Sequence, residues 1–196
     1  NGLGKEVLAF ILVPAGHAGA NKELLHNLEL PYQAVTSTDL YLTHYLNDSA
    51  NDPVMNRIRA QKLRNSEEDK VKIFFVPSYL NGDDGVLNMP YYDLLVGMDL
   101  TAFPSYYEPW GYTPLESLAF KVPTITTTLA GFGLWVKEHY NMNHPGIEVI
   151  HREDGDASNV ATAIAEWVKN YTQVGETEMQ KDRDNAKDVS RIALWD

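Results

Sequence analysis

The chain has 196 residues, of which 44% are hydrophobic and 22% charged, and it contains no cysteine. These values are typical of one globular domain and exclude a disordered tail. Its net charge of −11 argues against nucleic-acid binding and against a basic membrane-surface module, because both need clustered Lys and Arg. The lack of cysteine excludes disulfides, cysteine-zinc sites and thiol nucleophiles.

The longest apolar run, Val7 to Val13, is far shorter than the roughly 20 residues that cross a bilayer. The N-terminus carries no basic or signal-like segment, so we predict a cytoplasmic protein without a membrane partner. The chain lacks an initiator Met and reaches a buried-strand pattern within its first residues. We therefore expect it to be a piece of a longer protein.

Five short apolar runs predict strands along the chain. The first, Lys5 to Val13, is continuous and ends at Pro14, which is typical of a strand covered on both faces of a parallel sheet. The other four are residues 71–76, 100–103, 124–127 and 146–150. Helical patterns lie between them, clearest at residues 113–120 and 156–171 and weakest at 174–190. The alternation predicts an α/β fold built on a parallel sheet.

Residues 20–69 interrupt this alternation with two or three helical pieces. One begins at Asp52 and Pro53, a capping residue followed by proline at the first helical position. Fifty residues make a poor core alone, so we interpret the segment as a helical insertion in a crossover connection. Residues 1–196 are accordingly predicted to form a single domain.

The segment from Asp99 to Trp135 is the most informative, and its pattern predicts a strand, an aromatic loop, a helix, a strand and a glycine loop. The sequence from Thr113 to Glu116 has the pattern of a capping box with proline at the first helical position. Free N–H groups at such a helix start favour an anion, and Gly111 lets the backbone approach it closely. The pattern therefore fits two interpretations: a phosphate site at Gly111 to Thr113, or a well-capped helix with a structural role alone.

Two glutamates flank this helix start. Glu108 lies among Tyr106, Tyr107 and Trp110, where burial of a carboxylate is costly unless a polar partner meets it, and a ligand is one such partner. Glu116 also suits the capping box, which gives it a structural explanation. Paired carboxylates occur in glycoside hydrolases too, but the sequence does not give their separation.

The string FPSYYEPWGYTPLE, followed by TTLAGFG, resembles the donor-site signature of glycogen synthases of the fungal and animal type and their bacterial relatives. These are retaining glycosyltransferases with two Rossmann-like domains and an E-x7-E motif. Fainter similarity runs from IFFVPSYLN through PYYDLLVGMDL to SRIALWD. The resemblance implies the C-terminal, nucleotide-sugar-binding half of a GT-B glycosyltransferase, a Rossmann-like parallel sheet with helices on both faces.

The resemblance also implies roles for single residues. Glu108 matches the glutamate that lies beside the donor glucose and is implicated in catalysis, and Glu116 matches the one that binds the ribose hydroxyls. Tyr91 matches an aromatic residue that stacks on the nucleotide base. The segment that holds the diphosphate corresponds to Trp110, Gly111, Tyr112 and Thr113. Gly131 and Gly133 match a glycine loop near the sugar.

The implied reaction is transfer of glucose from UDP-glucose or ADP-glucose to the end of an α-1,4-glucan, with retention of configuration and without a metal or cofactor. The Arg and Lys that grip the diphosphate in the family match nothing in this sequence, so we expect these 196 residues to be inactive alone. A non-catalytic module that binds a nucleotide sugar is the alternative. Helical insertions of this kind contribute to oligomer contacts in the animal and fungal enzymes, which leaves room for a homo-oligomer.

Overall fold

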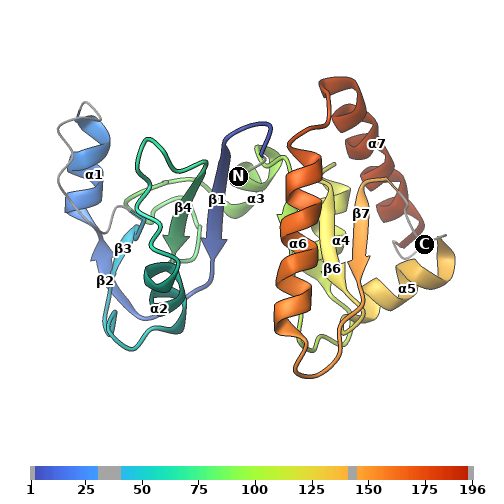
Figure 1. Cartoon of the computed structure of the whole chain (residues 1–196), viewed down its shortest axis with the longest axis horizontal. Coiled ribbons are helices and arrows are strands. Elements are labelled where there is room, and N and C mark those ends of the chain that lie inside the picture. The colour runs from blue at the N-terminus through green and yellow to red at the C-terminus, as the bar shows by residue number, and fades with distance from the viewer. Residues whose placement is uncertain (1–2, 31–40, 141–144, 194–196) are drawn as a thin grey trace. The chain divides into compact units, whose positions relative to one another are not determined.

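The computed structural model describes residues 3–30, 41–140 and 145–193 (Figure 1). They fall into two compact units, Asn1–Tyr91 and Tyr92–Asp196, called here the N-terminal and C-terminal units. The assignment of residues 1–196 to a single domain stays a prediction. No helix in the described part of the chain is both long and apolar enough to cross a membrane.

The N-terminal unit is built on two parallel apolar strands, β1 (Val7–Leu12) and β4 (Val71–Val76), as predicted. Residues 41–43 add a third parallel segment beside β4. The N–H of Phe75 donates to the carbonyl of Tyr41 at 2.6 Å, and the N–H of Thr43 donates to the carbonyl of Phe75 at 3.0 Å.

Helix α2 (Pro53–Ala60) packs on this sheet and begins as predicted. The side chain of Asp52 accepts the N–H of Met55 at 2.8 Å, which satisfies one of the unpaired donors at the helix start. The helix contributes two side chains to a fully apolar core, which consists of Tyr41, Leu42, Met55, Ile58 and Phe75.

Residues 20–69 are not purely helical. They hold α1 (Lys22–Glu29) and α2, but also β3 (His44–Leu46), which pairs antiparallel with β2 (His17–Ala20). Neither strand was predicted, because the small residues of HAGA in β2 carry neither the alternation nor the β-branched side chains that indicate a strand, and β3 has three residues. Whether the segment is an insertion stays a prediction.

The C-terminal unit contains three parallel strands in the order β5 (Thr101–Ala102), β6 (Thr124–Thr127) and β7 (Ile147–Ile150). One face of this sheet packs through Ile125 and Ile150 on Val160 of α6 (Ala157–Tyr171). The fold class is therefore confirmed as α/β with parallel strands flanked by helices. The parallel strands form two separate sheets, since β1 and β4 pair with each other and β5, β6 and β7 pair among themselves.

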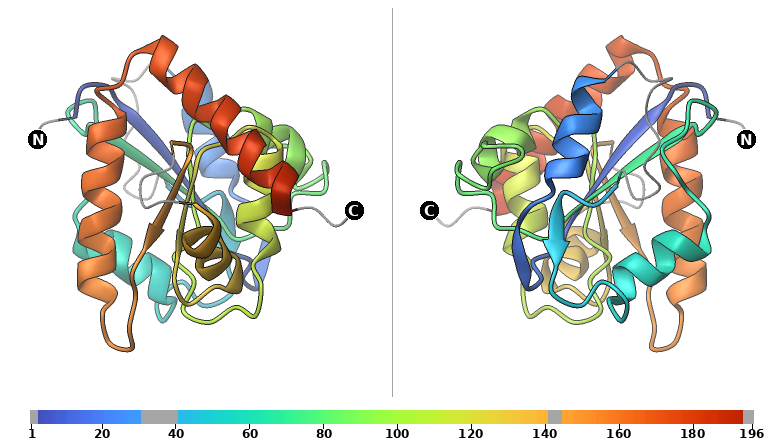
Figure 2. Two further views of the ribbon diagram at one scale, coloured as in Figure 1. Left: turned by 90° about the vertical axis from the view of Figure 1, so that its right-hand side faces the viewer. Right: turned by 90° about the vertical axis from the view of Figure 1, so that its left-hand side faces the viewer.

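The opposite face of this sheet carries α4 (Tyr112–Ala119), α5 (Gly131–His139) and α7 (Glu176–Ala193), as the left view of Figure 2 shows. Their shared core consists of Leu115, Leu118, Phe132, Val136, Ile147, Ala186 and Val189. Helix α7 was expected to be marginal from its weak periodicity. It is well formed because tertiary burial of its few apolar residues, more than intrinsic propensity, stabilises it.

Leu118 offers a direct test of this core, because its side chain is fully buried. We expect Leu118→Ala to lower the free energy of unfolding by about 2–5 kcal/mol through lost burial and a residual cavity. Leu134→Ala, on the exposed side of α5, should change it by less than about 0.5 kcal/mol. Denaturant unfolding measures both, and equal losses would contradict the assignment of Leu118 to the core.

Candidate functional site

The aromatic loop that follows β5 is fixed by its backbone to the start of α5. The N–H of Glu108 donates to the carbonyl of Leu129 at 3.0 Å, and the carbonyl of Glu108 accepts the N–H of Gly131 at 3.1 Å. The carbonyl of Trp110 accepts the N–H of Phe132 at 2.6 Å. The loop thus uses the first donors of α5, which would otherwise be unpaired at a helix start.

The predicted glycine loop is the first turn of α5, so that prediction is wrong. A Cβ at Gly131 would collide with the carbonyl of Pro109, and one at Gly133 would collide with the carbonyl of Thr127. Glycine is therefore needed here for close approach of two backbones. The helix was missed because its first residues include two glycines and no capping side chain precedes them.

Helix α4 begins at Tyr112, and its N-cap is Gly111 in the left-handed conformation, with φ 104°. The predicted capping box is therefore wrong, because Thr113 lies inside the helix and Pro114 is its third residue. As a glycine, Gly111 has no side chain that could accept hydrogen bonds from the N–H groups of the first turn. The first N–H groups of a helix have no partner within it, so those of Tyr112 and Thr113 are available to an anion.

Glu108 lies beside this helix start. Its Oε2 atom accepts a hydrogen bond from the Ser105 hydroxyl at 3.3 Å and would lie 3.6 Å from a Cβ built on Gly111. The surrounding tyrosines do not bury it as expected, because Tyr106 and Tyr107 are 58% and 81% exposed. The carboxylate is partly buried and is open to a ligand at the start of α4.

Trp110 is the aromatic of the loop that points inward. Its ring packs edge-on against Phe132, with ring centroids 5.8 Å apart, and against Trp135, at 6.3 Å. The side chain therefore anchors the loop to the core. What remains of Trp110 for a ligand is its backbone N–H.

Glu116 lies in the second turn of α4 and is partly buried. It does not cap the helix. The negative charge of Glu116 raises the pKa of Tyr92 above its ordinary value, together with burial and a hydrogen bond that the Tyr92 hydroxyl donates to the carboxylate. The carboxylate therefore has a neighbouring hydroxyl as well as solvent access.

Tyr91 is the first residue of α3 (Tyr91–Val96) and belongs to the N-terminal unit. Its N–H donates to the carbonyl of Leu80 at 3.0 Å. The segment with which it pairs continues from β4, where the carboxyl ends of parallel strands commonly carry ligand sites.

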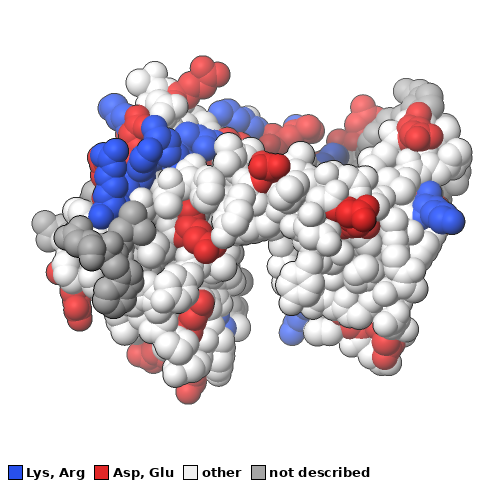
Figure 3. All heavy atoms as spheres, turned by 180° about the vertical axis from the view of Figure 1, so that it is seen from behind, with Lys and Arg blue, Asp and Glu red and all other residues white. Residues whose placement is uncertain are grey.

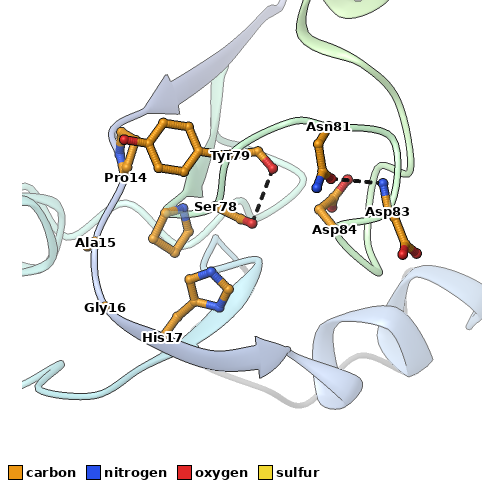
Figure 4. Close-up of a pocket in the computed structure, with 10 residues that line it drawn as sticks. Pro14, Ala15, Gly16, His17, Ser78, Tyr79, Asn81, Asp83 and Asp84 are labelled. Carbon is orange, nitrogen blue, oxygen red and sulfur yellow. Dashed lines mark hydrogen bonds between the residues drawn. The ribbon is translucent and has the colours of Figure 1, made fainter.

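A pocket of about 420 Å³ opens at the carboxyl ends of β1 and β4 (Figure 4). Its lining residues are Pro14, Ala15, Gly16, His17, Pro77, Ser78, Tyr79, Asn81, Asp83 and Asp84. This pocket was not predicted from the sequence. The two segments that follow β1 and β4 do carry Gly, His, Asn and Asp at the carboxyl ends of the strands, where parallel sheets commonly bind ligands.

One histidine that lines this pocket, His17, packs against a second histidine, His44. The ring of His17 packs edge-on against His44, with centroids 4.7 Å apart, and Nε2 of the fully buried His44 lies 2.8 Å from the carbonyl oxygen of Asp84. Burial, assisted by the charge on His44, lowers the pKa of His17. The pocket therefore presents a neutral imidazole at neutral pH.

The charges on the C-terminal unit are unevenly distributed. In Figure 3, where this unit is on the left, basic and acidic side chains gather over α7 at the top. The lower end of that face, toward which β7 points in Figure 1, shows mainly acidic and uncharged side chains.

The described residues include no cluster of three or more His, Asp or Glu side chains suited to a metal ion.

A sequence model of the glycogen synthase family matches residues 20–196, which include Tyr91, Glu108, Glu116 and the segment 110–113. The chain belongs to the glycogen synthase family. It is 32% identical over 157 residues to glycogen synthase isoform 1 of Saccharomyces cerevisiae, and 34% identical over 155 residues to the Neurospora crassa enzyme. It is 31% identical over 154 residues to the liver glycogen synthase of Mus musculus.

These matches cover 78–79% of this chain but 22% of each relative. The chain thus spans about a fifth of the length of the glycogen synthases it matches. The resemblance of the aromatic loop is confirmed at the level of the family. The roles of the individual residues in the loop are not tested by these similarities.

Proposed function

We propose that this chain is the nucleotide-sugar-binding part of a retaining glucosyltransferase of the glycogen synthase type. The observation that carries the proposal is the position of Glu108 beside Gly111, at the uncapped start of α4. A carboxylate next to a cluster of free N–H groups suits a sugar diphosphate. The N–H groups favour the negative diphosphate, and the carboxylate favours positive charge that develops on the sugar.

The proposed reaction breaks the bond between the anomeric carbon and the diphosphate and forms a bond to a hydroxyl of the α-1,4-glucan. The proton of that hydroxyl leaves with the diphosphate. Glu108 stabilises the positive charge that develops at the anomeric carbon. The N–H groups of Gly111, Tyr112 and Thr113, with that of Trp110, stabilise the departing diphosphate.

The nucleoside is proposed to contact two further residues. Glu116 accepts hydrogen bonds from the ribose hydroxyls, a role that its open carboxylate allows. Tyr91 stacks on the base, which fits uracil or adenine alike and leaves UDP-glucose and ADP-glucose as the two donors. Transfer also requires cationic side chains that hold the diphosphate, in addition to the N–H groups of residues 110–113, and these 196 residues alone are expected to transfer no glucose.

Calorimetric titration tests the binding of the donor. We expect UDP-glucose or ADP-glucose to bind the full-length protein, and Tyr91→Ala to weaken binding by about 5- to 150-fold through loss of stacking. Tyr91→Phe keeps the ring and should stay within about 2-fold of the wild type. Equal affinity of the Tyr91→Ala and wild-type proteins would refute the role of Tyr91, and absence of binding by either nucleotide sugar would refute the function.

The non-catalytic binding module differs from this proposal in one measurable respect. It binds the nucleotide sugar but does not transfer glucose to glycogen. Family membership and the intact pair Glu108 and Glu116 favour the transferase. A homo-oligomer stays a prediction, which sedimentation of the full-length protein tests.

A further inference from the structure

We propose that Arg152 is a positioning residue that holds the aromatic loop, and through it Glu108, in the geometry needed for glucosyl transfer. The inference deepens the proposed function and rests on it. Arg152 lies in the connection from β7 to α6, far along the sequence from the loop. Nothing in its local sequence indicates a role at this site.

The guanidinium of Arg152 contacts the loop at three consecutive residues. Its Nη1 donates to the carbonyl of Pro104 at 2.6 Å and to that of Ser105 at 3.4 Å. Its Cζ atom lies 4.9 Å from the centroid of the Tyr106 ring, which is a cation–π contact. One side chain therefore sets both the path of the loop backbone and the plane of an exposed ring.

The base of the Arg152 side chain is itself fixed. Its backbone N–H donates to the Thr128 hydroxyl at 3.0 Å, and that hydroxyl lies within 3.4 Å of the Arg152 carbonyl. The neighbouring Thr127 hydroxyl donates to the carbonyl of Ser105 at 2.8 Å. The segment after β6 thus supports both Arg152 and the loop that Arg152 contacts.

The loop connects these contacts to the proposed catalytic carboxylate. Ser105 accepts from Arg152 and Thr127 through its carbonyl, and its hydroxyl donates to Oε2 of Glu108 at 3.3 Å. A change in the position of Ser105 therefore moves a hydrogen-bond donor of Glu108. Displacement of a reacting group by about 1 Å costs on the order of 100-fold in rate.

A purely structural arginine in the same unit provides a contrast. Arg183 pairs with the carboxylate of Asp99 at 2.9 Å and so has its charge compensated. Among the described residues no carboxylate forms an ion pair with Arg152, and its buried Nε has no hydrogen-bond partner. A buried N–H donor without a partner is costly, which is expected where the loop geometry matters for function.

The test compares variants of the full-length protein. Arg152→Met is expected to lower kcat by about 10- to 100-fold, to change KM for the nucleotide sugar by less than about 3-fold, and to speed amide exchange at residues 105–108. Arg152→Lys keeps the charge without the planar fork, and should recover part of kcat. Arg191→Met, on an exposed side chain of α7, is the matched control and should leave kcat, KM and exchange unchanged.

A double variant tests whether Arg152 and Thr127 act through the same group, the carbonyl of Ser105. Thr127→Val removes the second donor to this carbonyl. The fold loss of kcat in the double variant Arg152→Met/Thr127→Val should be smaller than the product of the fold losses in the two single variants. Unchanged kcat and unchanged exchange at 105–108 in Arg152→Met would overturn the proposal. So would faster exchange throughout the C-terminal unit without recovery by Arg152→Lys, because that pattern marks a structural role alone.

The exchange measurement needs no substrate, which separates the two proposals. A wild-type protein that transfers no glucose would refute the proposed function. Faster amide exchange confined to residues 105–108 in Arg152→Met would then still support the role of Arg152 in positioning the loop. Unchanged exchange at these residues would refute that role, whatever the transfer activity.

Discussion

Glu108→Gln is expected to reduce kcat for glucosyl transfer in the full-length protein by about 100- to 1,000-fold. The substitution keeps the shape and the hydrogen bond from Ser105 but removes the negative charge that is proposed to stabilise the transition state. KM for the nucleotide sugar should change little, because the missing interaction develops only in the transition state. Initial rates of transfer to glycogen at several donor concentrations measure both quantities.

The matched control is Glu166→Gln, which makes the same chemical change at an exposed position of α6. We expect its kcat and KM to equal those of the wild type. If Glu108→Gln retained kcat within about 2-fold of this control, the proposed catalytic role of Glu108 would be refuted.

Gly131→Ala is expected to destabilise the protein by about 1–3 kcal/mol or more and to lower the transfer rate at the same time. The added Cβ collides with the carbonyl of Pro109, the residue that follows Glu108, and neither backbone can move without breaking the hydrogen bond between Gly131 and Glu108. Denaturant unfolding gives the stability, and the transfer assay gives the rate.

Gly175→Ala serves as the comparison, because a Cβ at Gly175 would meet no described atom within 4 Å. Its free energy of unfolding should stay within about 0.5 kcal/mol of the wild type. A Gly131→Ala protein that unfolds and reacts like Gly175→Ala would contradict the close approach of the loop to α5.

The five parallel strands were predictable because each lies in a short apolar run. β4 and β6 have the predicted boundaries, 71–76 and 124–127, since a short apolar run is recognised from the local sequence alone. How the strands pair depends on contacts between distant segments. The sequence therefore indicated parallel strands but not their division into two sheets.

The errors at the site have one physical origin. Gly111 adopts a left-handed conformation and moves the helix start ahead of Thr113, which a capping pattern cannot reveal. The glycines of α5 resemble a loop locally, but they allow two backbones to touch. In both cases tertiary contacts decide the conformation that local propensity predicts incorrectly.

The candidate carboxylates Glu108 and Glu116 were predictable, and Arg152, which is proposed to position Glu108, was not. Glu108 and Glu116 follow from a motif within one continuous segment. Arg152 meets that segment across 48 positions of sequence, as a lone arginine with no companion pattern. The structure is needed to bring it to the loop.

Hydrogen–deuterium exchange of the full-length protein, with and without saturating UDP-glucose or ADP-glucose, tests the central claim most directly. We expect the nucleotide sugar to slow exchange at the amides of residues 110–113, where the diphosphate is proposed to bind. Residues 172–175, in the connection between α6 and α7, should be unaffected. Unchanged exchange at residues 110–113 under saturating donor would contradict the assignment of this helix start to the nucleotide sugar.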